Sequence, residues 1–260
     1  MLATGRPIRR AIDVFKGALA ASADTPRLGQ VDIAPTLTST RKAHLMNLVM
    51  IPERTALINI DLQNCFVEGC ELSVPDALTV ANRVNRVAAA CRVAGIQVIH
   101  VSHVLRADGS NMGMLGEMVP LVKTGLINKG APSAALHKQL ALDPKDILLD
   151  KPRFGAFHGT DLELILRARG IETVIISGVA TNVCCETTAR EAMVRDFHVV
   201  FLSDATATFA MGGLSAAELQ TATLATLGFL SAEVLSVDEL IQKLNRGAPA
   251  SEVERLHLLG

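Results

Sequence analysis

The chain has 260 residues, enough for one large domain or two small ones. Its 25 lysine and arginine residues nearly balance 26 aspartate and glutamate residues, so its charge gives no reason to expect nucleic acid or an anionic membrane as a partner. Aromatic residues make up only 3 % and apolar residues 49 %, which argues against base-stacking platforms and predicts a core of aliphatic side chains.

The five cysteines form neither an even-numbered disulfide framework nor a C-x-x-C zinc motif. The longest apolar runs are shorter than the roughly 18 residues needed to cross a bilayer. We therefore expect a reduced, cytoplasmic protein with no membrane segment.

Residues 1–52 form a distinct leader, with an amphipathic helix pattern over 8–19. Its basic character resembles a transit peptide, but a surface helix or an oligomerisation arm is the favoured interpretation, because its apolar side chains offer a surface to a neighbouring subunit. The main domain is predicted over 53–245, and 246–260 forms a C-terminal tail.

Strand and helix patterns alternate along the main domain. Gly95 and Gly170 end two of the helices, and Thr160 with Glu163 has the spacing of a capping box. In chain order the sequence predicts a strand over 55–61, a helix over 77–94, strands over 96–104 and 145–149, a helix over 160–169, a strand over 172–179, a helix over 182–196, a strand over 198–205, a helix over 215–227 and a last strand within 232–240.

The predicted strands are nearly continuous runs of Val, Ile and Leu, as expected when helices cover both faces of a sheet. The fold class is therefore α/β, a single-domain doubly wound parallel sheet in three layers. In such sheets ligands bind at the carboxyl ends of the strands, so polar residues just past these ends are the candidates for chemistry.

Three such residues are Asp61, Lys151 and Cys184. Each alone has a structural explanation, since cysteine is often buried, aspartate often ends a strand and lysine is often a surface charge. Together they suit acyl transfer: Asp61 accepts the thiol proton, Lys151 stabilises the negative charge, and the thiolate attacks a carbonyl carbon. Because Cys184 falls in the first turn of a predicted helix, we expect its thiol pKa to lie below about 8.5.

The segments TALINIDLQNCF, KPRFGAF and SGVATNVCCETTAREA resemble the three signature segments of the isochorismatase-like cysteine hydrolase superfamily. The resemblance covers about 55–244 and is closest to ureidoacrylate amidohydrolases and related carbamoyl- and ureide-cleaving enzymes. It implies a Rossmann-like fold and a catalytic triad of Asp61, Lys151 and Cys184. It further implies a non-proline cis peptide bond between Val179 and Ala180, with the N–H groups of Ala180 and Cys184 as the oxyanion hole.

The chain departs from the family pattern at several positions. Cys65 stands where the family usually has an aspartate, and Gly155 stands where many members have serine. Nicotinamidases of the superfamily bind a metal through an Asp-x-His…His cluster, whereas His100 and His103 lie three residues apart on a strand and face opposite sides. We therefore expect no metal and no cofactor.

Members that hydrolyse the vinyl ether of isochorismate lack the nucleophilic cysteine, so Cys184 favours an amide substrate. The sequence predicts six residues around the triad as substrate contacts: Gln63 and Asn64 after the first strand, Arg106 and Asn111 after the second, and Phe157 and His158 after Lys151.

The predicted function is hydrolysis of a small linear amide, a ureido or carbamoyl compound, through a thioester on Cys184. The predicted partners are a small-molecule substrate and further copies of the chain in a homodimer or homotetramer. Two alternatives stay open, a metal-assisted nicotinamidase-type amidase and a noncatalytic binding or oligomerisation module on the same fold.

Overall fold

The computed structural model describes residues 50–247. The predicted leader 1–52, apart from its last three residues, lies outside the described part, and so does the predicted helix over 8–19. The C-terminal tail lies outside it from residue 248 onward. None of the helices within 50–247 is long and apolar enough to cross a membrane.

The centre of the domain is one sheet of six parallel strands in the order β3-β2-β1-β4-β5-β6. This is the strand order of a doubly wound sheet, and the predicted fold class is confirmed. The two central strands are buried along their whole length, which explains their continuous apolar sequences. The strands are β1 (Thr55–Ile60), β2 (Gln97–His103), β3 (Ile147–Lys151), β4 (Thr173–Val179), β5 (His198–Ala207) and β6 (Glu233–Leu235).

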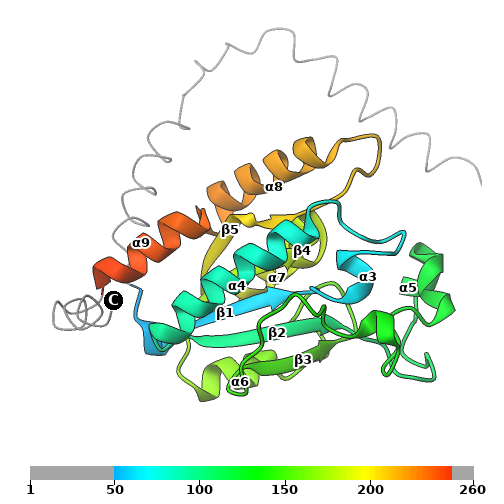
Figure 1. Ribbon diagram of the computed structural model, residues 1–260, viewed down its shortest axis with the longest axis horizontal. Helices are drawn as coiled ribbons and strands as arrows, with labels where there is room; N and C mark the ends of the chain where they lie inside the picture. The colour runs from blue at the N-terminus through cyan, green and yellow to red at the C-terminus, as the bar shows by residue number, and fades with distance from the viewer. Residues whose placement is uncertain (1–49, 248–260) are drawn as a thin grey trace, which may run out of the picture. The chain divides into compact units, whose positions relative to one another are not determined.

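Helices cover both faces of the sheet (Figure 1). One face packs against α4 (Ala77–Val93) and α9 (Val237–Gly247), and the apolar cluster between them includes Leu57, Val84 and Leu240. The other face packs against α6 (Leu162–Ala168), α7 (Glu186–Met193) and α8 (Ala216–Leu230), with Ile58, Leu166 and Leu227 in the corresponding cluster.

Two local predictions differ from the structure. The helix α9 was not expected, because 232–240 was assigned to a strand; β6 takes only three residues, and α9 begins two residues after it. The predicted capping box does not form either, since Thr160 Oγ1 donates to Ala156 O and the N-cap of α6 is Asp161. A capping box does form at α8, between Ser215 and Glu218.

The connection from β2 to β3 is long, and its first part lies at the carboxyl ends of the strands, to the right of the sheet in Figure 1, before the chain returns to the start of β3. It contains α5 (Leu115–Met118) and two 3₁₀ turns, η2 (Pro120–Thr124) and η3 (Pro132–Ala134). Together with α3 (Asn64–Val67) it forms a small apolar cluster that includes the buried Cys65, the residue that replaces the usual aspartate of the family pattern.

Gly178 lets β4 approach β1 just before Asp61. Its φ is +114°, and a Cβ atom at this position would lie 2.0 Å from the carbonyl oxygen of Ile60. Only glycine fits there without a shift of the β1 backbone that carries Asp61.

We expect Gly178→Ala to lower stability more than Gly170→Ala. Gly170 also has a positive φ, of +66°, but has open space around the added Cβ, so its substitution should cost only backbone strain, about 1–2 kcal/mol. At Gly178 the collision with Ile60 should add about 1–3 kcal/mol. Urea unfolding of both variants measures the difference, and equal losses of stability would contradict this account of the β1–β4 approach.

Candidate active site

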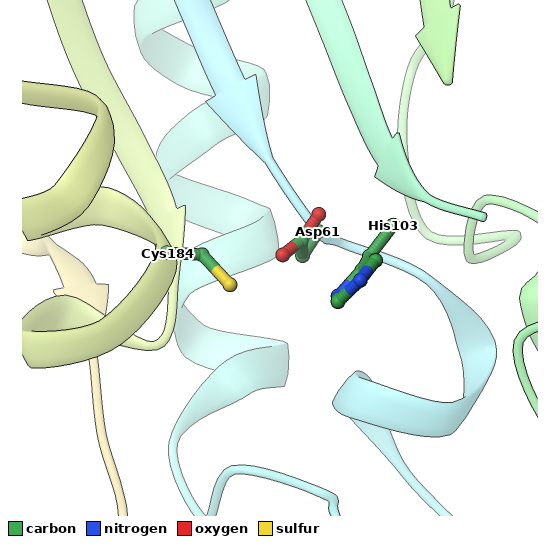
Figure 2. Close-up of side chains that lie close together, drawn as sticks. All are labelled: Asp61, His103 and Cys184. Atoms are coloured by element: carbon green, nitrogen blue, oxygen red, sulfur yellow. The ribbon is translucent and has the colours of Figure 1, made fainter. Parts of the chain in front are cut away.

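Three separate segments place Asp61, Lys151 and Cys184 at the carboxyl edge of the sheet. Asp61 directly follows β1, and Lys151 is the last residue of β3. Cys184 lies in η4 (Thr181–Cys185), a π-helical turn between β4 and α7. In Figure 2 the sulfur of Cys184 points toward the carboxylate of Asp61.

Asp61 and Lys151 form a buried ion pair. Lys151 Nζ lies 2.9 Å from Asp61 Oδ2, and both side chains are at most 2 % exposed. Lys151 Nζ also donates a hydrogen bond of 2.9 Å to the carbonyl oxygen of Arg153. Asp61 itself has a positive φ of 54°, and its N–H donates to Val101 O, so the backbone holds the carboxylate at this edge.

The ion pair determines the protonation of the site. Burial raises the pKa of Asp61, and the neighbouring Lys151 offsets this only in part. Burial alone would lower the pKa of Lys151, but Asp61 and Cys184 more than compensate, and the net pKa is raised. Lys151 therefore stays an ammonium while Asp61 gains basicity.

The expectation of a lowered pKa for Cys184 is wrong. Burial raises the pKa of this thiol well above its ordinary value, and the negative charge of Asp61 raises it further. Lys151 acts in the opposite direction but does not reverse the shift. The resting thiol is thus neutral, and it could act as a nucleophile only with a base that removes its proton.

The neighbouring cysteine points elsewhere. The Sγ atom of Cys185 lies 3.8 Å from Ser177 O, and the residue is completely buried in the core on the α7 side of the sheet. Of the two adjacent cysteines, Cys184 lines the cavity described below and Cys185 does not.

His103 is a further site residue, which the sequence pattern indicates only as a candidate metal ligand. It ends β2, beside Asp61, and Figure 2 shows its ring on the side of Asp61 opposite Cys184, directed toward the space below the carboxylate. One ligand atom from each of these three side chains lies within 4.8 Å of the others. The signal was available, because His103 is a polar residue at the end of a strand that neighbours β1.

His103 is a neutral hydrogen-bond acceptor. Its Nε2 atom is buried without a hydrogen-bond partner, and burial together with the charge of Lys151 holds its pKa well below the ordinary range. Gln63 fixes its backbone: Gln63 Oε1 accepts from His103 N at 2.6 Å, and Gln63 Nε2 donates to His103 O at 3.1 Å.

Asp61, His103 and Cys184 are also a set of groups that can ligate a metal ion. The ammonium of Lys151, 2.9 Å from Asp61, opposes a second cation at the same carboxylate. His100 does not join the group, since its Nε2 atom lies 3.2 Å from Asp146 Oδ2, away from the triad. This arrangement suits proton transfer better than metal binding.

A cavity of about 340 Å³ opens onto Asp61, His103 and Cys184. Within the described residues its polar lining side chains are those of Asp61, His103 and Cys184, and the remaining lining residues are apolar. None of the six predicted substrate contacts is among the lining residues: Gln63, Asn64, Arg106, Asn111, Phe157 and His158.

Hydrogen bonds within the loops engage the side-chain amides of Gln63, Asn64 and Asn111. Asn64 Nδ2 donates to Pro132 O, as Gln63 does to His103 O, so both amides hold loops together. Asn111 Oδ1 accepts from the backbone N–H of Arg106, whose side chain is exposed.

The two residues predicted after Lys151 point away from the cavity. Phe157 is buried against Phe197, with ring centroids 5.9 Å apart, and His158 is exposed. The turn after β3 places Phe154 in the cavity wall instead.

The peptide bond between Val179 and Ala180 is cis, and both residues line the cavity beside Cys184. The pattern of the isochorismatase domain family matches residues 55–239. The chain belongs to this family.

The relatives and solved structures agree with this membership. Ureidoacrylate amidohydrolase RutB of Methylorubrum extorquens is 34 % identical over 59 % of this chain and 70 % of its own length. Nicotinamidase 3 of Arabidopsis thaliana is 33 % identical over 80 % of this chain and 97 % of its own. A cysteine hydrolase from Pseudomonas syringae pv. phaseolicola 1448A superposes with a TM-score of 0.74 and 33 % identity, over 78 % of this chain and 97 % of the other.

These findings confirm the predicted superfamily. They also confirm the prediction that this isochorismatase-family chain is a cysteine hydrolase acting on carbon–nitrogen bonds other than peptide bonds.

Two variants should separate the roles of the charges. In Asp61→Asn the negative charge that raises the pKa of Cys184 is lost and Lys151 remains, so iodoacetamide should label Cys184 at pH 7 at least as fast as in the wild type, while amide turnover collapses. In Lys151→Met only the carboxylate remains beside the thiol, and labelling should slow by about tenfold or more.

Peptide mapping must follow the labelling, because the half-buried Cys70 is a competing thiol. The double variant Asp61→Asn/Lys151→Met is the control, since it leaves no unpaired buried charge. If Lys151→Met labels as fast as the wild type, Lys151 is not the electrostatic partner of the nucleophile.

Proposed function

We propose that the protein is a cysteine-dependent amidohydrolase that cleaves a C–N bond of a small linear amide through a thioester on Cys184. The observation that carries the proposal is the placement of a buried thiol beside a carboxylate of raised basicity, at the end of one cavity. The ammonium of Lys151 keeps that carboxylate ionised although it is buried.

The acylation step starts from a neutral thiol on Cys184 and an ionised carboxylate on Asp61. Asp61 takes the proton from Cys184 as Sγ forms a bond to the carbonyl carbon, and the carbonyl oxygen becomes an oxyanion. The tetrahedral intermediate collapses when the C–N bond breaks, and Asp61 returns its proton to the departing nitrogen. The products of this half-reaction are an amine or ammonia and a thioester on Cys184.

Deacylation uses the same base. Asp61 takes a proton from a water molecule that attacks the thioester carbon, the C–S bond breaks, and the proton passes to the thiolate. The acid or carbamate leaves, and Cys184 regains its neutral resting state. Lys151 stays charged throughout and limits the energetic cost of the thiolate.

We assign the oxyanion hole to the N–H groups of Ala180 and Cys184. Both residues line the cavity, and the turn between them brings the two positions to the same end of it. The carbonyl oxygen of Ala180 accepts from the N–H groups of Val183 and Cys185, so it is engaged within the turn.

The finer substrate assignment is a ureido or carbamoyl compound. It is supported by the similarity to ureidoacrylate amidohydrolases, whose name describes cleavage of a ureide. Such a substrate presents a carbonyl flanked by two nitrogens, either of which can leave, and its hydrolysis releases ammonia or a carbamate.

A nicotinamidase-type activity is the second candidate. Nicotinamidase 3 is similar along 97 % of its own length, and its name also describes an amide hydrolase. In the metal-assisted form of this candidate, Asp61, His103 and Cys184 are the available ligands in the described part of the chain.

The proposal includes a reducing, cytoplasmic setting and a homodimer or homotetramer. All five cysteines are free thiols, and Cys184 needs its thiol for catalysis. The leader over 1–52 is the proposed oligomerisation arm.

Replacing the nucleophile should abolish turnover. Cys184→Ala should reduce amide hydrolysis by several orders of magnitude without unfolding the protein, because no covalent intermediate can form. Cys185→Ala is the matched control, since it removes the adjacent buried thiol that faces away from the cavity. Ammonia release from a panel of ureides and amides measures both, and the reverse ranking would refute the assignment.

Chelators should leave the activity intact. Prolonged treatment with EDTA or phenanthroline removes a bound transition metal, and the proposed mechanism uses only Asp61, Lys151 and Cys184. Loss of ammonia release that zinc or iron restores would favour the metal-assisted nicotinamidase-type candidate instead.

A further inference from the structure

We propose that the substrate is an amide whose remaining part is uncharged and apolar, a short aliphatic or aromatic group. The inference rests on the proposed amidohydrolase function and specifies its substrate class. It comes from the composition of the cavity that opens onto Cys184.

The cavity has one polar end, and the rest of its described lining is apolar. Asp61, His103 and Cys184 form the polar end, within 4.8 Å of one another. The apolar wall comes from five separate segments and includes Phe66, Leu72, Val122, Phe154, Phe209 and Met211. Such a cavity matches a molecule with one hydrogen-bonding group and a hydrophobic remainder.

No cation lines the cavity among residues 50–247. Lys151 is paired with Asp61, and the guanidinium of Arg153 donates to the carbonyl oxygens of Asn111 and Pro152. The side chain of Arg106 is exposed and lies 3.6 Å from Asp108. A substrate carboxylate in the cavity would lose its hydration, gain no ion pair and be repelled by Asp61.

The cavity therefore disfavours ureidoacrylate, the compound in the name of several relatives, since that compound carries a carboxylate. The described residues that line the cavity include the side chains proposed to cleave the amide, but none that could bind a carboxylate at the apolar end of the cavity.

His103 gives the amide its orientation. Its Nε2 atom is buried and has no partner in the described structure, and a ring nitrogen of His103 lies within 4.8 Å of the ligand atoms of Asp61 and Cys184. A neutral imidazole acceptor at this position suits the N–H of the scissile amide and places that nitrogen near Asp61, which returns the proton. The hydrophobic remainder of the substrate then extends along the apolar wall.

The volume limits the size of the substrate. At about 340 Å³ the cavity is near the lower end of the roughly 300–1,000 Å³ found for small-molecule sites. A chain of a few carbons or one six-membered ring, together with the amide, suits this space.

Two matched pairs of compounds test the inference. Pentanamide ends in a methyl group where glutaramate has a carboxylate. Propylurea and 3-ureidopropionate differ in the same way. We expect the neutral member of each hydrolysed pair to have a kcat/KM about a hundredfold higher, because the charged member must bury its carboxylate unpaired. From acetamide to pentanamide, kcat/KM should rise about fourfold for each added methylene.

Protection of Cys184 from iodoacetamide by the same compounds reports binding without turnover. If the neutral compounds protect but no compound is hydrolysed, the proposed function fails, while the preference of the cavity for uncharged, apolar ligands stands. If the charged members are hydrolysed or protect better than the neutral ones, the inference is overturned and the amidohydrolase function stands.

A cation introduced into the wall should change the preference. Met211 lines the cavity and is partly exposed, so Met211→Lys should raise the ratio of charged to neutral kcat/KM by about tenfold or more. Met118→Lys is the matched control, since Met118 is 74 % exposed and does not line the cavity. Phe154→Lys, at the partly exposed Phe154, is a second variant in case Met211→Lys does not fold. An unchanged ratio in a folded variant that still labels at Cys184 would overturn the inference.

Discussion

The buried ion pair between Lys151 and Asp61 is the interaction on which the rest of the site depends. Removing two such charges from water costs several kcal/mol for each ion, and their mutual attraction offsets this only at close range. The 2.9 Å contact is set by two strand ends that flank β2, so the register of the sheet fixes the geometry of the pair. The ammonium stabilises a carboxylate that burial alone would protonate, and this carboxylate, beside Cys184, is the base of the proposed mechanism.

The sequence predicts the positions of these residues because it predicts where strands end. Asp61 follows an apolar strand and Lys151 comes directly after the segment ILLD, and parallel topology brings the ends of such strands to one edge. The protonation of Cys184 could not be predicted in the same way. It depends on burial by segments distant in sequence, including the long connection between β2 and β3, and this burial outweighs the local effect of the helix terminus.

The predicted substrate contacts show the limit of sequence reasoning. Proximity in sequence to the triad does not say which way a side chain in a turn points: Phe157 enters the core, whereas Phe154, three residues earlier, lines the cavity. The same turn contains Gly155, where a Cβ atom would lie 2.2 Å from the carboxylate of Glu191. Since Glu191 accepts from the N–H of Phe157, the glycine and this hydrogen bond together fix the path of the chain after Lys151.

The apolar wall of the cavity links reactivity to selectivity. The same exclusion of water raises the pKa values of Asp61 and Cys184, while the ammonium of Lys151 opposes protonation of Asp61. In the proposed mechanism the pair therefore starts as a carboxylate and a neutral thiol, and one proton transfer begins the reaction. A charged group on the substrate would face the same loss of hydration without a partner such as Lys151, and it would also raise the energy of the developing thiolate if it were negative. An uncharged substrate avoids both effects. The transfer of its apolar part from water into the cavity is favourable, and it adds no charge that would weaken the action of Lys151 on Asp61 and the nascent thiolate. In the proposed mechanism, the environment that makes Asp61 an effective base is therefore also the environment that selects against an acid as substrate.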